Sequence, residues 1–189
     1  MDNLDIIFDS GDWDERSFST LADRAILSTL EHMGLDPDLV EISVMACDDV
    51  RIADLNAEFR EKSVPTNVLS WPAQHLAPEG EGHAPPAPVQ GFDGMVELGD
   101  IALGYDTCKR EATESGKWMD DHLTHLIVHG TLHLLGYDHI TEGDAALMER
   151  LEVEILGNLG IDDPYISDPT TKGADMRPPL PETGPNGRH

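Results

Sequence analysis

A run of closely spaced histidines constrains this chain more than any other feature of its sequence. His125, His129 and His133 follow one another at intervals of four residues. On a helix of about 3.6 residues per turn, side chains at this spacing share one face. Gly136 then allows the left-handed backbone that ends a helix, and His139 follows it. The pattern predicts a helix and a turn that bring several imidazoles to one point.

We interpret His129, His133 and His139 as the ligands of one zinc ion. Zinc with three protein ligands keeps a fourth position for water, which is typical of catalytic rather than structural sites. Neutral imidazoles leave the ion its full charge, which lowers the pKa of a bound water toward about 7. The spacing therefore indicates a hydrolase, although nickel or another divalent ion also fits three imidazoles.

Two further histidines, His122 and His125, lie on the same predicted helix before the three ligands. Each is a candidate for a hydrogen-bonding partner of a ligand, a substrate contact or an ordinary surface residue. His125 is better placed, one turn before His129, and we expect it to be a catalytic residue.

The residue after the first ligand narrows the reaction. In the helical metalloprotease motif H-E-x-x-H this residue is a glutamate that acts as general base. Here it is Gly130, so a peptidase of that kind lacks its proton acceptor. The sequence favours a substrate whose hydrolysis is promoted by an activated water and a nearby cation, and phosphodiesters fit that description.

The remaining pattern predicts one α+β domain over residues 1–163. Short apolar segments and apolar stripes at helical spacing indicate about four strands and about five helices. The expected strands cover residues 4–8, 40–47, 67–71 and 98–103, and the expected helices cover about 18–33, 48–59, 106–115, 118–135 and 142–159.

Two segments rich in proline and glycine interrupt this pattern. Residues 73–95 predict a long, mobile surface insertion, which we expect to project into solvent rather than to cover the site. Its histidines, His75 and His83, are interpreted as solvated loop residues. Residues 164–189 have almost nothing to bury and predict a disordered C-terminal tail.

The charge of the chain limits its partners. Twelve Lys and Arg residues against 37 Asp and Glu residues give a net charge of −25, which opposes indiscriminate attraction to phosphate backbones and anionic membranes. No apolar run approaches the roughly 18 residues that span a bilayer, and the N-terminus has no signal-peptide pattern. We expect a cytoplasmic protein without a membrane partner, and an RNA substrate must meet a local positive site.

The histidine run, residues 129–139, resembles the signature H-G-x-L-H-L-x-G-Y-D-H of the YbeY family, bacterial metal-dependent endoribonucleases. Similar blocks at residues 55–72 and 98–103 extend the likeness over roughly residues 40–158. The resemblance implies a small mixed sheet packed with helices, a zincin-like metal helix carrying one zinc ion, and hydrolysis of single-stranded RNA. It also implies a role in maturing the 3′ end of small-subunit ribosomal RNA and in ribosome quality control. The implied partners are ribosomal RNA and the ribosome or its proteins, and no DNA.

Arg60 occupies the position of the family's functional arginine, and the resemblance implies that it acts in catalysis. A guanidinium can hold a phosphate by two hydrogen bonds and offset charge in the transition state. The family usually has aspartate and phenylalanine where this chain has Asn67 and Trp71. Residue 67 therefore offers no carboxylate for proton transfer.

Two other functions remain open. A ribosome-associated assembly factor, whose metal mainly stabilises the fold, would explain the acidity, because docking on a basic ribosomal protein suits a charge of −25. A zinc metalloprotease-like hydrolase is the weaker alternative, because Gly130 replaces the expected glutamate.

Overall fold

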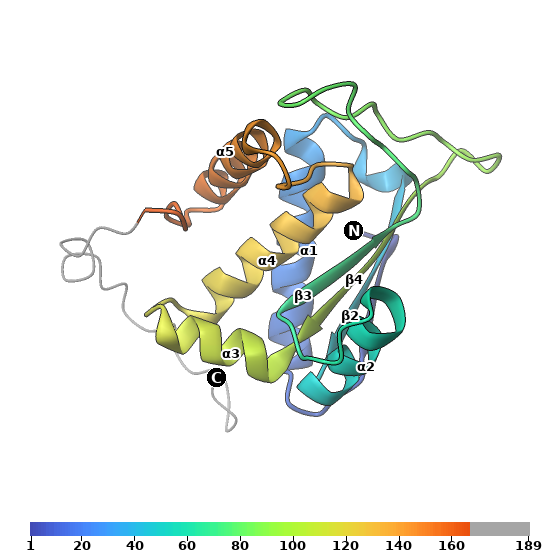
Figure 1. The fold of residues 1–189 in the computed structure, drawn as a ribbon. Coiled ribbons are helices and arrows are strands. Elements are labelled where there is room, and N and C mark those ends of the chain that lie inside the picture. The colour runs from blue at the N-terminus through green and yellow to red at the C-terminus, as the bar shows by residue number, and fades with distance from the viewer. Residues whose placement is uncertain (167–189) are drawn as a thin grey trace.

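The computed structural model of this chain describes residues 1–166, which contain four strands and five α-helices (Figure 1). This confirms the predicted α+β class and the number of elements. Most of the expected tail, residues 167–189, lies outside the described residues. The elements in chain order are β1 (Leu4–Phe8), α1 (Glu15–His32), β2 (Val40–Cys47), α2 (Asp49–Arg60), β3 (Val68–Pro72), β4 (Val96–Gly104), α3 (Tyr105–Glu114), α4 (Met119–Leu134) and α5 (Glu142–Asn158).

The four strands form one mixed sheet in the order β1-β2-β4-β3. β1, β2 and β4 run parallel, whereas β3 is antiparallel to β4 and forms an edge of the sheet. Burial alternates along β2, as a sheet covered unequally on its two faces requires.

A bulge in β4 sets which of its side chains face the main core. The register with β2 shifts where Gly99 adopts a φ of 129°. A Cβ on Gly99 would lie 2.1 Å from the carbonyl oxygen of Trp71 on β3, so only glycine fits here. Because of the extra residue, Leu98 and Ile101 both reach the same apolar cluster, although they lie three positions apart.

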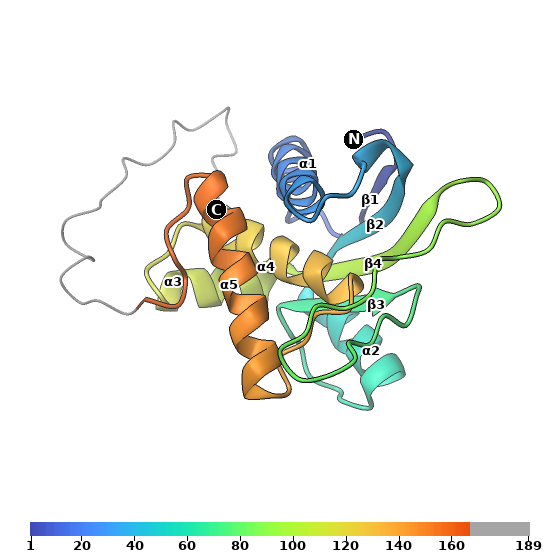
Figure 2. The same ribbon diagram turned by 90° about the horizontal axis from the view of Figure 1, so that it is seen from above.

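Helices cover both faces of the sheet (Figures 1 and 2). The larger apolar cluster joins α1, α4 and α5 to one face, and a smaller cluster lies under α2 on the other. α4 is central, since it packs against α1, α3, α5, β3 and β4. Among the described residues, no helix combines the length and apolar character needed to cross a membrane.

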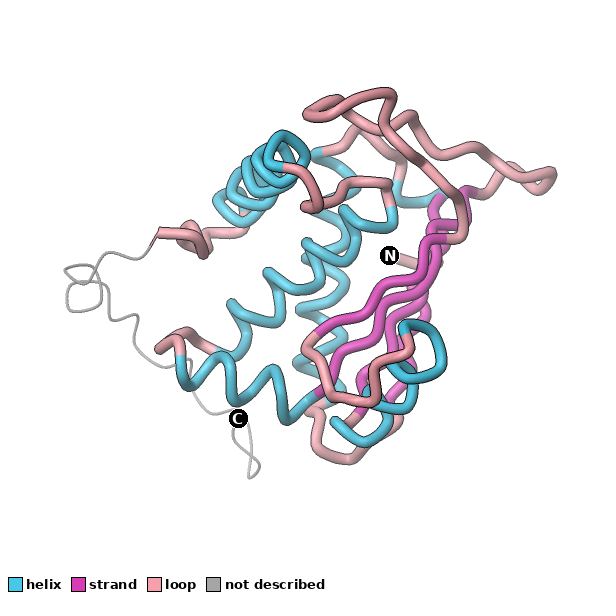
Figure 3. The backbone as a smooth tube through the Cα atoms, viewed as in Figure 1, coloured by secondary structure: helices cyan, strands magenta, loops and turns pink. Residues whose placement is uncertain are grey.

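The insertion of residues 73–95 joins β3 to β4 as a long loop (Figure 3). Leu76 is buried, and the backbone amide of Gly82 donates a hydrogen bond to Asp144 at the start of α5. Farther along, the loop extends away from the sheet and Phe92 is exposed (Figure 2). The expectation that the whole insertion projects into solvent is therefore wrong for its first half, because an apolar side chain and a turn amide find partners there. Its mobility stays a prediction.

Candidate metal centre

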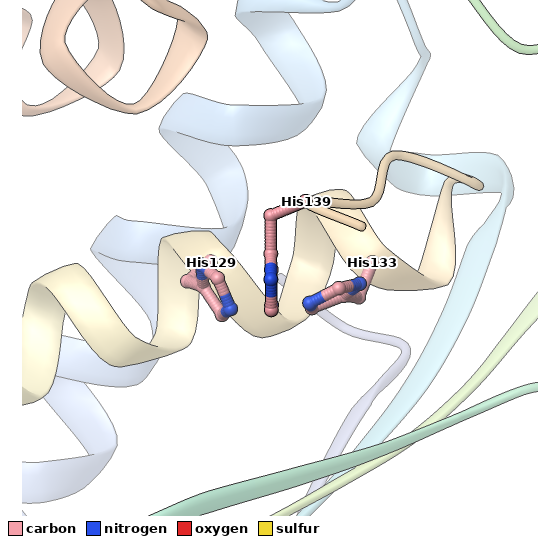
Figure 4. A group of neighbouring side chains, drawn as sticks. All are labelled: His129, His133 and His139. Atoms are coloured by element: carbon pink, nitrogen blue, oxygen red, sulfur yellow. The ribbon is translucent and has the colours of Figure 1, made fainter. Parts of the chain in front are cut away.

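Three imidazoles meet at the C-terminal end of α4. His129 and His133 project from successive turns of the helix, and His139 returns from the loop beyond it (Figure 4). One ring nitrogen of each lies within 4.8 Å of those of the other two. The triad predicted from spacing can therefore hold a metal ion. No other group of three histidines, cysteines or carboxylates within residues 1–166 comes together in this way.

The turn that returns His139 depends on Gly136. This residue has a φ of +97°, and its amide donates a hydrogen bond to the carbonyl oxygen of His133, as in a glycine-terminated helix. A Cβ at this position would lie 2.1 Å from the carbonyl oxygen of Leu76 in the insertion. Glycine is thus required both for the backbone conformation and for the contact with the insertion.

Gly130 lies where α4 packs against β4. A Cβ on Gly130 would lie 3.2 to 3.4 Å from three side-chain carbons of Ile101, so the glycine lets the helix approach the sheet closely. The missing glutamate of the metalloprotease motif therefore has a packing reason, since a longer side chain would have to displace Ile101 or redirect the helix.

The donor set suits a divalent cation near neutral pH. Burial, together with the neighbouring rings of His129 and His139, lowers the pKa of His133 to about 4. A neutral imidazole is the form that binds metals, so His133 keeps a nitrogen lone pair available. Three such nitrogens fit zinc and also other borderline metals such as nickel.

Glu152 of α5 supports the first ligand. Its side chain is fully buried, and its Oε1 lies 2.5 Å from Nδ1 of His129. Burial raises the pKa of Glu152, but hydrogen bonds with His125 and His129 outweigh it and lower the pKa to about 2. Since an ionised carboxylate only accepts hydrogen bonds, Nδ1 of His129 carries the hydrogen and Nε2 is left for a metal.

His125 contacts this carboxylate and does not join the triad. Its Nε2 lies 3.5 Å from Oε1 of Glu152 and 3.3 Å from the hydroxyl of Tyr165, which itself donates to Oε2 of Glu152. His125 lines a small separate cavity of about 160 Å³. Tyr165 falls in the segment that the sequence predicts as tail, yet it packs against these side chains. The catalytic role of His125 stays a prediction.

His122 belongs to another polar cluster. Its Nε2 lies 3.5 Å from Oε1 of Glu111 on α3, and burial lowers its pKa. The other carboxylate oxygen of Glu111 accepts a hydrogen bond from Asn67 at 3.2 Å. Asn67 is therefore held by the cluster and also lines the cavity beside the triad.

The triad lies in the wall of an open cavity of about 780 Å³. The edge strand β3, the end of α2, the first residues of the insertion, the loop after α4 and the start of α5 also contribute to this wall. Arg60, at the end of α2, donates a hydrogen bond from Nη2 to the carbonyl oxygen of Ser70 at 3.2 Å. Arg60 is the only lysine or arginine lining the cavity among the described residues. The structure thus brings Arg60 and the triad to one cavity.

Sequence reasoning missed Glu152 and Tyr165. A signal for Glu152 exists, because it follows Met148 by one helical turn and lies beside Leu151 on the buried face of α5. An acidic residue on an apolar stripe requires a buried partner. Tyr165 gave no comparable signal, since it lies beyond the last apolar stripe at helical spacing, in a segment rich in aspartate and proline.

A helix that presents several imidazole nitrogens to an open cavity is the arrangement expected of a metal-dependent hydrolase. Comparisons with known proteins identify its family. The family model described as endoribonuclease YbeY matches residues 6–160. The endoribonuclease YbeY of Ruegeria pomeroyi is 68% identical over 145 residues, which cover 77% of this chain and 88% of that protein. The one from Dinoroseobacter shibae is 54% identical over 162 residues, 86% of this chain and 90% of that protein.

The chain therefore belongs to the YbeY family of endoribonucleases, and it is a metal-dependent enzyme of that class. This confirms the resemblance found in the histidine run. The solution structure of a Thermotoga maritima protein is also similar, with a TM-score of 0.50 at 20% identity over 87% of this chain and 99% of that chain. At this identity the likeness concerns the fold alone.

Proposed function

We propose that this enzyme uses zinc to cleave single-stranded RNA, and that it matures the 3′ end of small-subunit ribosomal RNA in the cytoplasm and acts in ribosome quality control. The observation that carries the proposal is the placement of Arg60 and the triad in the wall of one cavity. A flexible single strand can bend a phosphate into such a cavity, whereas a duplex holds its phosphates on a stiff backbone.

The ion and the side chains have different roles in the proposed reaction. A divalent ion on His129, His133 and His139 would supply a Lewis acid and lower the pKa of a water molecule that it binds. Arg60 donates one N–H to Ser70, which leaves other N–H groups of the guanidinium for a phosphate. The carbonyl of Ser70 fixes the guanidinium at the wall, where its charge would offset the charge that develops on the phosphate oxygens. His125 was predicted to be catalytic, but it contacts Glu152 and does not line the cavity of the triad, so we assign it a supporting role through that carboxylate.

Arg60→Ala is expected to slow RNA cleavage by about 10²- to 10³-fold, because a donor aimed at developing charge is lost. Arg60→Lys keeps the charge without the planar fork and should give an intermediate rate. Initial rates on a fluorescent single-stranded oligonucleotide, with zinc content measured in parallel, test this. Arg150→Ala is the matched control, since Arg150 is exposed on α5 and the net charge changes equally. Cleavage by Arg60→Ala at the original rate would remove Arg60 from the mechanism.

A ribosome-associated assembly factor is the second candidate, and the net charge of −25 favours it. Cells that carry Arg60→Ala separate the two functions. Normal ribosomal RNA maturation, with the variant stably folded, would favour assembly, whereas accumulation of unprocessed RNA favours the nuclease. The metalloprotease alternative is disfavoured by the packing of Gly130 on Ile101, and digestion of casein that a chelator abolishes would revive it.

A further inference from the structure

We propose that Glu152 is a positioning residue that sets the zinc affinity of the triad through His129, and that Tyr165 and His125 hold its carboxylate in place. The inference rests on the metal site in the function proposed above.

The contacts of Glu152 are directed at a ligand. Its Oε1 lies 2.5 Å from Nδ1 of His129 and 3.5 Å from Nε2 of His125, and its Oε2 accepts a hydrogen bond from Tyr165. Both oxygens are therefore engaged, while the side chain is fully withdrawn from water. No other acidic side chain within residues 1–166 is buried to this degree.

Stability alone does not account for this carboxylate. Glu152 lies on the face of α5 that carries the buried side chains of Met148, Leu151 and Ile155. Removing a charge from water is costly, and apolar residues of similar volume often stabilise a fold as well as a buried ion pair does or better. The hydrogen bond that Glu152 accepts from His129 explains why a charged side chain occupies this buried position.

The effect on His129 follows from the hydrogen bond. Because the carboxylate accepts from Nδ1, it fixes the ring in the tautomer that leaves Nε2 unprotonated. It also fixes the direction in which the ring points and makes Nε2 a stronger donor to a cation. His129 and His133 share a helix, so the orientation of the first ring decides whether the two nitrogens converge.

Tyr165 and His125 act one step further out. The hydroxyl of Tyr165 occupies Oε2, which leaves Oε1 directed at His129. The segment that carries Tyr165 is anchored as well, since the amine of Lys117 donates to the carbonyl of Pro164 at 3.3 Å. The described residues after α5, up to residue 166, therefore contribute to the metal centre although none of them belongs to the triad.

Glu152→Gln is expected to raise the dissociation constant for zinc about 10- to 100-fold, because the amide keeps the shape and loses the charge. The measurement is competition against a chromophoric zinc chelator with the untagged full chain. Glu154→Gln is the matched control, since Glu154 lies on the same helix, has a side chain that is 47% exposed and pairs with His32 instead of a residue of the triad. Its zinc affinity should equal that of the unchanged chain.

A purely structural role would lower the melting temperature of the metal-free protein and leave the zinc affinity of folded protein unchanged, which would overturn the inference. Tyr165→Phe is the second variant and serves if Glu152→Gln does not fold. It keeps the charge of Glu152 and removes one hydrogen bond to it, so zinc binding should weaken about 2- to 10-fold. An unchanged zinc affinity in Tyr165→Phe would then contradict the inference. If the unchanged chain bound no zinc, the proposed metal site itself would fail, an outcome distinct from failure of Glu152 alone.

Discussion

Replacing His129 by alanine is expected to abolish both stoichiometric zinc binding and RNA cleavage. The triad offers three nitrogens within 4.8 Å of one another. Without His129 only two protein ligands remain, one fewer than a catalytic zinc site with an open position for water has. The loss of affinity should exceed the roughly 10- to 100-fold that a missing supporting hydrogen bond costs. Zinc content after dialysis and initial cleavage rates on single-stranded RNA are the two measurements.

His83→Ala provides the control for this experiment, because His83 lies in the insertion and outside the triad. That variant should keep its zinc and its activity. RNA cut at the original rate by His129→Ala would indicate a contaminating nuclease, and full zinc content in that variant would place the ion elsewhere. Removal of zinc by a chelator should mimic the substitution and be reversed by adding zinc back.

Gly136→Ala is expected to destabilise the protein by about 2–5 kcal/mol and to weaken zinc binding. A side chain at positive φ costs about 1–2 kcal/mol, and overpacking against the insertion adds about 1–3 kcal/mol. The new Cβ would meet the carbonyl oxygen of Leu76, so the turn must shift and carry His139 with it. Thermal unfolding with and without zinc measures both effects, and a fall of at least about 4 °C is expected for a domain of this size.

Gly157→Ala is the comparison for the glycine experiment. Gly157 lies in the last turn of α5 with no atom within 4 Å of an added Cβ, so alanine should be neutral or stabilising by up to about 1 kcal/mol. If Gly136→Ala unfolded at the temperature of the original chain and kept its zinc, the turn would not depend on this glycine.

Local patterns in the sequence predicted most of the fold and the triad. The helical spacing of the histidines and the glycine after them are local features, and the turn forms as they indicate. α2 and β3 also begin and end within one residue of their expected bounds. α1 begins at Glu15, earlier than predicted, because the side chain of Asp14 accepts a hydrogen bond from the amide of Ser17 and starts the helix there.

Contacts between distant segments could not be predicted in this way. The insertion packs on the turn after α4, where Leu76 closely approaches Gly136. The two residues are far apart in the sequence, and no periodic pattern predicts this contact. The pairing of Glu152 with His129 joins two helices whose relative placement depends on the whole core. Arg60 was assigned from the family resemblance, and only the fold shows that α2 ends at the same cavity as the triad.

The three metal-binding rings all lie in one short stretch, residues 129–139, and they join no remote parts of the chain. An ion there closes a small loop, and the chain entropy saved by closing a loop grows only slowly with its length. Two apolar clusters, rather than the ion, tie α1, α2 and α5 to the sheet. The metal-free protein should therefore keep its fold, so the ion can exchange during the life of the enzyme without unfolding it.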